Sequence, residues 1–476
     1  MMSVDTPARP GDEASPEFRV ETGVLATMRR IQRPSRLRNR ELLLLLFAFV
    51  VNGAAMVLVQ LGAIGEVQPG PLVAVAGLAV LVLVLHGGLR VWAPNADPVL
   101  LPVAVALNGI GIAEIYRIDI AEKLTGWGAA STRQIVWSAI AMVAAVLVVA
   151  LLKNYRVLHR YTYVFGFIAV VMLLLPLIPG LGLNVNGARV WISIGGVLSF
   201  QPGEVAKIAL AIFFAGYLVR TRESLSMVGK TFLGMRFPRL RDLGPILVIW
   251  LLSMAVIVFQ RDLGTALLYF GMFVIMLYMA TGRTSWVLIG MTLFVGGAVV
   301  ASQTLSYVNG RFRNWLDAFN PDQYEAWGGS HQLVQGIFGL AHGGLVGTGL
   351  GQGQPAITPL AESDYIFASL GEELGLAGVM ALLGLYLIIV ARGLSIGFTA
   401  QDDFMKLLAV GLSFTIALQV FIMVGGVTRV IPLTGLTTPF LAAGGSSLVA
   451  NWIIVALLLR LSDSVRKPGP MVGAAS

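Results

Sequence analysis

The chain has 476 residues, of which 57% are hydrophobic and only 12% are charged, about half the charged fraction of a soluble domain. With a mean hydropathy of +0.81, this composition excludes a water-soluble fold. The absence of cysteine excludes disulfides and thiol chemistry, and the net charge of +8 fits the basic cytoplasmic loops of a membrane protein and does not indicate a nucleic-acid partner.

Residues 1–40 form the first segment. The first 24 or so are rich in Pro, Gly, Ser and acidic residues, and six arginines follow between Arg29 and Arg40. Such a stretch has little to bury and is expected to be disordered, with its arginines held on anionic lipid headgroups. We interpret it as a basic cytoplasmic leader.

Twelve apolar segments follow, most of them about 17 to 25 residues long, as a hydrocarbon core of ~30 Å requires. They are residues 42–61, 71–89, 98–115, 134–152, 161–178, 203–219, 243–260, 264–281, 286–304, 367–391, 404–426 and 441–460. The pattern predicts an all-α, polytopic transmembrane helical bundle with about twelve spans.

The charges of the connecting loops give the orientation. Three loops predicted to be inside, residues 153–160, 220–242 and 460–469, are basic, whereas residues 62–70, predicted to be outside, contain no Lys or Arg. By the positive-inside rule both termini are cytoplasmic. The cations that fall outside against this trend are Arg117, Lys123, Arg133, Arg189, Arg311 and Arg313.

Two outer segments are unusual. Residues 179–202 are too polar and Gly-rich to span but too apolar for a free loop, so we expect a re-entrant segment that lines a cavity. Residues 305–366 form one large extracellular loop, in which HQLVQGIFGLAHGG reads as a short amphipathic or re-entrant helix. Loops of this length are usually functional or disordered, and the aromatic residues and glycines of this one favour function.

Ionisable residues at membrane depth are the strongest functional signal, since each costs about 2.5–3.5 kcal/mol at a helix centre. Glu204 and Lys207 lie three residues apart, on one face of the helix that begins there. They are either a self-neutralising pair that packs two helices or a polar contact at the mouth of an outward-facing cavity.

Three further carboxylates each allow two interpretations. Asp262 is expected to cap the following helix, with binding or metal ligation as the second possibility. Asp364, with Ser363, precedes an apolar helix, so local sequence favours a cap over a functional role. Glu373 is either catalytic or the buried partner of a cation.

Residues 430–447, VIPLTGLTTPFLAAGGSS, must be locally non-helical and are either a simple helix break or part of a cavity wall. In this topology the unusual polar groups gather on the outer side, which favours a site at an outer cavity over a path through the protein. No Walker motif, dinucleotide fingerprint or Ser/His/Asp arrangement is evident.

Taken in order, the motifs resemble those of the SEDS family of shape, elongation, division and sporulation proteins. They are NGARVWISIGG with FQPGEVAKIA, QRDLGTA, RFRNWLDAFNPD, HQLVQGIFGLAHGGLVGTGLG, ESDYIFASLGEELG and IPLTGLTTPFLAAGGSS. The resemblance covers residues 98–465. It implies a ten-helix core, preceded by two additional helices in residues 41–92 and followed by a short cytoplasmic tail, residues 466–476.

The resemblance also implies a function. Family members polymerise lipid II, a disaccharide-peptide on undecaprenyl pyrophosphate, together with a class B penicillin-binding protein and other membrane proteins of the elongation or division complex. The family's essential aspartate corresponds to Asp364, and its Glu-x-x-Lys pair corresponds to Glu204 and Lys207. The family's usual Arg-Trp is Val190-Trp191 here, with Arg189 one position earlier.

A peptidoglycan glycosyltransferase needs a base for the acceptor hydroxyl, and its pyrophosphate leaving group is already an anion. One carboxylate, Asp364, with cations that hold the pyrophosphate therefore suffices, and a divalent ion, Mg²⁺ or Mn²⁺, could share that work. No cofactor is otherwise expected. The residues expected to bind substrate are Glu204, Lys207, Arg189, Arg311, Arg313, Gln335, Asp262, Glu373 and Ser446.

Three other functions stay open. The short tail after the last span favours a RodA-type polymerase of cell elongation and rod shape over an FtsW-type polymerase of the division septum. A lipid II flippase would also use broken helices and intramembrane charges, but it would need a polar path across the midplane. A non-catalytic scaffold of either complex would not depend on Asp364.

Overall fold

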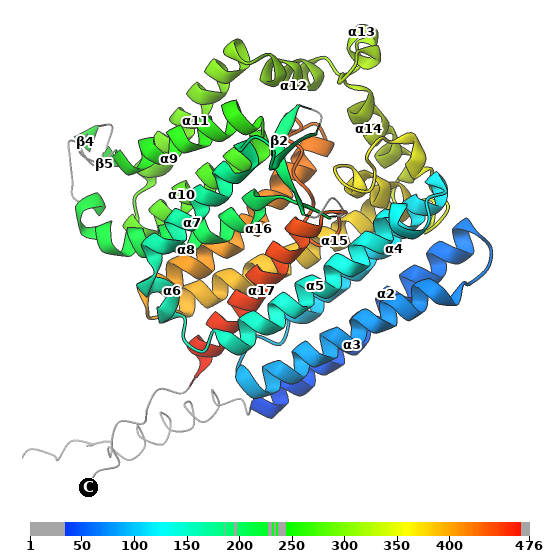
Figure 1. Cartoon of the computed structure of the whole chain (residues 1–476), viewed down its shortest axis with the longest axis horizontal. Helices are drawn as coiled ribbons and strands as arrows, with labels where there is room; N and C mark the ends of the chain where they lie inside the picture. The colour runs from blue at the N-terminus through cyan, green and yellow to red at the C-terminus, as the bar shows by residue number, and fades with distance from the viewer. Residues whose placement is uncertain are drawn as a thin grey trace, which may run out of the picture.

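The computed structural model describes residues 34–185, 187–194, 198–226, 231–232, 235–236 and 244–467 (Figure 1). The predicted all-α class is confirmed. The helices are α2 (Pro34–Ala63), α3 (Pro69–Trp92), α4 (Leu100–Glu122), α5 (Ala130–Leu151), α6 (Arg156–Arg160), α7 (Thr162–Leu174), α8 (Pro202–Ser226), α9 (Gly244–Ala255), α10 (Leu263–Thr281), α11 (Thr284–Thr304), α12 (Ser306–Leu316), α13 (Pro321–Glu325), α14 (His331–Gly343), α15 (Ile366–Thr399), α16 (Asp403–Val427) and α17 (Gly445–Arg466). Short turns add η1 (Gly126–Gly128), η2 (Leu175–Leu177), the π-helical η4 (Val256–Gln260) and η5 (Pro355–Ile357).

Each of the twelve predicted apolar segments contains a helix. Within the described residues, ten helices are long and apolar enough to cross a membrane. The two others, α7 continued by η2 and α9 continued by η4, are shorter. The chain is therefore a multi-pass membrane protein, and the number twelve stays a prediction.

The first helix begins earlier than expected from the sequence. Arg38, predicted to lie in a disordered leader, lies on α2 and is buried, with its Nη1 2.6 Å from Glu41 Oε2 and its Nη2 bonded to the carbonyl of Ala96. Glu41 Oε1 in turn lies 2.6 Å from His86 Nδ1 on α3. A buried charge is tolerated when it is paired in this way, so the helix extends through these polar residues. The rest of the predicted leader, residues 1–33, and most of the predicted tail, residues 468–476, lie outside the described residues.

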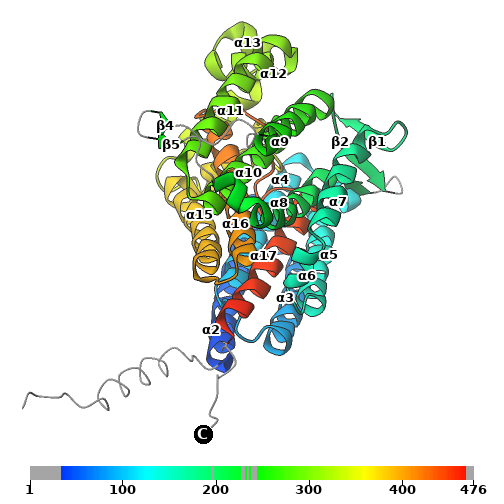
Figure 2. The same cartoon turned by 90° about the vertical axis from the view of Figure 1, so that its left-hand side faces the viewer.

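Both described ends of the chain lie at one end of the bundle, which we call the termini end (Figure 2). There Arg466 Nη2 lies 2.6 Å from Asp97 Oδ2, and the backbone N–H of Asn95 donates to Asp463 Oδ1 over 2.9 Å. The sheet, α12 and α13 lie at the opposite end, the far end. Residues 460–467, part of a loop predicted to be inside, thus lie at the end opposite the sheet and α12, which belong to the two segments predicted to be outside.

The expected re-entrant segment is a small sheet instead. Its antiparallel order is β1 (Gly182–Val185), β2 (Ala188–Ile194) and β3 (Leu198–Phe200), with Leu183 opposite Trp191 and Ser193 opposite Ser199. A sheet can satisfy polar backbone groups as a helix does. The chain reverses at Gly187, where φ is +84°, a conformation that favours glycine. A further hairpin, β4 (Thr231–Phe232) and β5 (Met235–Arg236), lies between α8 and α9.

The four most buried spans are α4, α8, α16 and α17. The candidate site lies at the starts of α8, α10 and α15, since Glu204 is in the first turn of α8 and Asp262 and Asp364 come just before α10 and α15 (Figure 1). About half of the predicted large outer loop is helical, in α12, α13, α14 and η5. The stretch HQLVQGIFGLAHGG contains α14, as its amphipathic pattern predicts.

Candidate functional site

Asp364 lies in the turn that leads into α15. The cap of this helix is Tyr365, which makes no side-chain capping bond, so the capping role that local sequence favours for Asp364 is wrong. The half-buried carboxylate of Asp364 lies against Gly435, where a Cβ would be 3.8 Å from Oδ2. Among the residues that the structure describes, this carboxylate accepts no hydrogen bond. It can therefore bond a ligand.

Burial and nearby charges together set the proton affinity of Asp364. Burial raises the pKa of Asp364 to about 6; the guanidinium of Arg311 opposes this rise, and the carboxylates of Glu362 and Asp262 add to it. A carboxylate with this pKa is mostly ionised at neutral pH and still basic enough to accept a proton. Charged groups from three separate segments thus act on one another at the far end.

Asp262 caps α10, as the sequence predicts. Its Oδ1 accepts from the Thr265 backbone N–H over 2.9 Å and its Oδ2 accepts from the Thr265 hydroxyl over 2.6 Å. Burial raises the pKa of Asp262 and the bonds from Thr265 oppose that rise, while nearby Glu204 adds to it. The cap role does not remove Asp262 from the site, because its charge still acts on Asp364.

Arg261 is a residue to which the sequence pattern assigns no role. Its φ of +58° is rare for a residue with a side chain. The guanidinium carbon lies 5.9 Å from the centre of the Tyr307 ring on α12, and Nη1 lies 3.3 Å from where a Cβ would stand on Gly187. Arg261 therefore lies between the β1–β2 turn and α12. Its left-handed backbone could not have been inferred from the residues around it.

The end of α12, the helix that carries Arg311, is held by Arg429. Arg429, also with positive φ at +60°, donates from Nε to the Trp315 carbonyl over 2.7 Å and from Nη2 to the Leu316 carbonyl over 2.7 Å. Trp315 Nε1 donates back to the carbonyl of Arg429 over 3.0 Å. Since helix C-terminal carbonyls lack intrahelical donors, Arg429 caps α12 and ties it to the segment that contains Gly435.

Glu204 and Lys207 form the buried pair that their spacing predicts. Lys207 Nζ lies 2.6 Å from Glu204 Oε2, 3.1 Å from Gln419 Oε1 and 3.3 Å from Asn451 Oδ1, so it joins α8 to α16 and α17. Lys207 is only 2% exposed. The helix-packing interpretation is thus confirmed for the ammonium group. Glu204 also belongs to the site, because its charge raises the pKa of Asp262.

Glu373 is the buried partner of a cation, one of its two predicted roles. Its Oε1 lies 3.1 Å from Arg117 Nε and accepts from the Gly353 N–H, while its Oε2 accepts from the Gly351 N–H over 2.7 Å. The second guanidinium nitrogen of Arg117 bonds the Gly353 carbonyl. Arg117 is one of the cations predicted to lie outside, contrary to the positive-inside rule. Its bonds to Glu373 and Gly353 anchor the loop before η5.

Two other predicted residues are bonded within the protein. Ser446 Oγ accepts from the backbone N–H of Gln201 over 2.8 Å, which ties the start of α17 to the start of α8. Gln335 Nε2 donates to the Tyr324 hydroxyl over 2.7 Å, between α14 and α13. Arg189 and Arg313 are exposed at the far end, the first on β2 and the second on α12.

The segment before α17 forms part of the site wall. Gly435, with φ of +79°, lies beside Asp364, and the Ala443 N–H donates to the Glu362 carbonyl over 2.7 Å. The Thr437 carbonyl accepts from Gln419 Nε2 over 2.9 Å. This break therefore contacts the segment that carries Asp364, and its role as a cavity wall stays a prediction. Within the described part of the chain, no three Asp, Glu or His side chains gather as metal ligands.

Comparison with known proteins shows the family of this chain. Residues 98–467 match the model of the FtsW/RodA/SpoVE family, described as cell cycle proteins. The peptidoglycan glycosyltransferase RodA of Mycobacterium tuberculosis strain H37Rv is 46% identical over 91% of this chain and 92% of its own length. A probable peptidoglycan glycosyltransferase FtsW of Trichlorobacter lovleyi is 31% identical over 79% of this chain and 95% of its own length.

Two solved structures share the fold. A peptidoglycan synthase complex studied for its coordination of polymerization and crosslinking matches with a TM-score of 0.61 and 23% identity, over 78% of this chain and 98% of the matched one. The rod shape determining protein RodA of Thermus thermophilus matches with a TM-score of 0.52 and 22% identity, over 77% and 96% of the two chains.

Proposed function

The chain belongs to the FtsW/RodA/SpoVE family, which is the SEDS family that its motifs resemble, and from this membership we propose that it is a peptidoglycan glycosyltransferase of the RodA type. It polymerises lipid II into glycan strands, for cell elongation and rod shape. The single observation that carries the proposed mechanism is the Asp364 carboxylate, which is half-buried, accepts no hydrogen bond from the described residues, and is acted on by the cation of Arg311.

In the proposed reaction, Asp364 takes the proton from a hydroxyl of the acceptor sugar. The hydroxyl oxygen bonds the anomeric carbon of the donor sugar, and the bond from that carbon to the pyrophosphate breaks. Undecaprenyl pyrophosphate leaves with the electron pair, and the proton on Asp364 passes to solvent. Arg311 stabilises the charge that develops on the leaving group. No partner acid is required.

A divalent cation is a further part of the proposal, and no step of the reaction passes through it. Mg²⁺ usually binds one or two carboxylates together with substrate phosphates, so Asp364 and Asp262 with the pyrophosphate would suit it. The chemistry it would supply is neutralisation of phosphate charge. A polymerisation assay with and without a chelator tests this point.

The proposed location is the cytoplasmic membrane, with both termini in the cytoplasm and the site outside. The separation of the termini end from the far end supports this orientation, as does the basic character of the loops predicted to be inside. A class B penicillin-binding protein is the proposed partner, since the similar synthase complex is named for polymerization and crosslinking together. An elongation complex is favoured over a division complex by the 46% identity to RodA.

The pH dependence should show a carboxylate that must be ionised. Because a protonated Asp364 cannot accept a proton, kcat/KM for lipid II should fall about tenfold per pH unit below the Asp364 pKa of about 6 and level off above it. Initial rates of polymer formation between about pH 4.5 and pH 8 measure this profile. A flat profile across the Asp364 pKa would contradict the general-base role.

Replacing Arg311 with Ala should lower turnover about a hundredfold, the loss typical of one group that stabilises transition-state charge. It should also move the acid limb to higher pH, because Arg311 lowers the pKa of Asp364. Arg313 lies two residues away on α12, pointing from another face, so Arg313→Ala should cost less. If both variants lost little activity and to the same extent, a role for these two cations in pyrophosphate binding would be contradicted.

Arg429 is expected to act as a positioning residue through α12. Its replacement by Ala removes the two donors to the Trp315 and Leu316 carbonyls, and should lower polymerisation about tenfold by loosening Arg311. If it acts in this way, Arg429→Ala should cost much less when Arg311 is already Ala. Fully additive losses in the double variant would mean that Arg429 acts elsewhere.

A further inference from the structure

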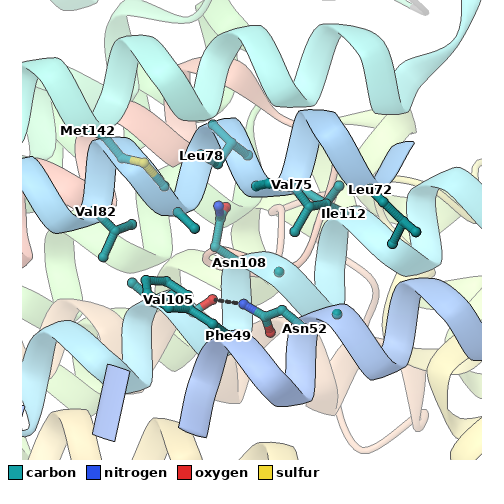
Figure 3. Close-up of a pocket in the computed structure, with 14 residues that line it drawn as sticks. Phe49, Asn52, Leu72, Val75, Leu78, Val82, Val105, Asn108, Ile112 and Met142 are labelled. Atoms are coloured by element: carbon teal, nitrogen blue, oxygen red, sulfur yellow. Dashed lines mark hydrogen bonds between the residues drawn. The ribbon is translucent and has the colours of Figure 1, made fainter. Parts of the chain in front are cut away.

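A cavity of about 270 Å³ lies among the first four described helices, α2, α3, α4 and α5 (Figure 3). Fourteen residues line it, and only two of them, Asn52 and Asn108, have polar side chains. The remaining wall is built by residues such as Leu78, Val82 and Met142. The cavity shares no residue with the site around Asp364, and nothing in the proposed reaction uses it.

Each of the two amides has an unsatisfied oxygen. Asn52 Nδ2 donates to the Val105 carbonyl over 3.0 Å, and Asn108 Nδ2 donates to Ser138 Oγ over 3.3 Å. Their Oδ1 atoms are buried and accept no hydrogen bond from the described residues. The residues are only 5% and 2% exposed. An amide oxygen without a donor costs several kcal/mol in hydrocarbon.

The orientation of the Asn52 amide follows from its bonding. Its bond to the Val105 carbonyl requires an N–H donor, so its other terminal atom must be the oxygen acceptor. Gly109 makes this contact possible, because a Cβ there would lie 2.0 Å from Asn52 Cγ. Asn52 therefore presents a fixed acceptor, in the middle of a membrane-spanning helix, to whatever fills the cavity.

The walls favour a hydroxyl on a hydrocarbon over bulk water. Apart from the two asparagines, the twelve residues that line the cavity have no polar side chain, so water that filled the whole volume would lack hydrogen-bond partners over most of the wall. A hydroxyl has a single donor, and the hydrocarbon that carries it fills the apolar volume. The cavity also reaches the lipid-facing surface, because Ala76 on α3 lines it and is itself exposed. A ligand can enter from the bilayer.

We propose that this cavity binds a lipid-soluble chain that carries a hydroxyl group, with Asn52 Oδ1 as the acceptor. The site is made by the two helices that precede the family match and by the start of the matched region, so α2 and α3 have a ligand-binding role in addition to packing.

The test uses the whole protein in lipid nanodiscs and two photoreactive probes, a primary alcohol on a straight chain of myristyl length with a mid-chain diazirine and the same chain without the hydroxyl. The alcohol should label peptides of α2, α3 and α4 about five- to tenfold more than the hydrocarbon, the gain expected from one buried hydrogen bond. Asn52→Leu should reduce labelling by the alcohol to the level of the hydrocarbon. Equal labelling of the wild type by both probes would overturn the proposal.

A second variant removes the dependence on how well the Asn52 variant folds. Gly53 lines the cavity, and a Cβ on it would meet no atom within 4 Å, so Gly53→Leu fills the space without a clash at Cβ. It should abolish labelling by both probes. Gly77→Leu, on α3 and also without an atom within 4 Å of Cβ, lies outside the lining and is the matched control. Alcohol labelling that survives Gly53→Leu would place the probe elsewhere and contradict the assignment.

Discussion

Asp364→Asn protein should form no glycan strand from lipid II while it expresses and inserts as the wild type does. The amide has nearly the same shape as the carboxylate but cannot accept the proton of the acceptor hydroxyl, and loss of a general base typically costs about 10²- to 10⁴-fold. The fold should tolerate the change, since no hydrogen bond from the described residues depends on this carboxylate. Polymer length analysis of purified protein with lipid II measures the effect.

The matched control is Asp322→Asn, an exposed carboxylate on α13 in the same outer loop. It should polymerise at the wild-type rate. Activity of Asp364→Asn close to that of the wild type would end the general-base proposal. Two further measurements distinguish the rival functions. A flippase would move labelled lipid II across vesicles without making polymer. A scaffold would still support the growth of cells that carry Asp364→Ala.

Glu204→Ala should lower the stability of the fold more than any other substitution proposed for the site. It leaves the ammonium of Lys207, which is only 2% exposed, without its carboxylate 2.6 Å away. Breaking a buried pair on one side costs about 3–5 kcal/mol. Thermal unfolding in detergent, followed by gel filtration of the heated samples, should show a clearly lower midpoint for this variant.

The double variant Glu204→Gln with Lys207→Met separates stability from activity. Removing both charges should restore most of the stability, because no uncompensated charge remains at this pair. Polymerisation should stay low, since the charge of Glu204 acts on Asp262, which in turn acts on Asp364. If stability and activity both return, the pair only packs helices and should be removed from the substrate-binding set.

Several parts of the site could be predicted from short stretches of sequence. The Asp262 cap follows from a carboxylate placed before an apolar run, and the Glu204–Lys207 pair follows from a spacing of three on a helix. Asp364 was a different case. Its neighbours favoured a cap, and only the resemblance to a family favoured catalysis, because a local pattern cannot report which hydrogen bonds a carboxylate will lack.

The positions of the cations depended on contacts between distant segments. The charge of Arg311 acts on Asp364, and Arg429 holds the end of the helix that carries Arg311; the spans α15 and α16 lie between these two arginines in the chain. Arg117 reaches Glu373 across an even longer stretch of chain. Neither pairing leaves a periodic signal. The three-stranded sheet within residues 182–200 could likewise not be predicted, since re-entrant segments and hairpins share a polar, glycine-rich composition.

The amino-acid sequence by itself determined that this chain is a multi-pass helical membrane protein, because apolar length, charge bias and capping residues act on neighbours a few positions apart. The tertiary structure alone decided which charges act on Asp364 and which are neutralised in buried ion pairs. That outcome depends on how α8, α10, α12 and α15 pack against one another, and packing is a property of the whole bundle rather than of any one segment.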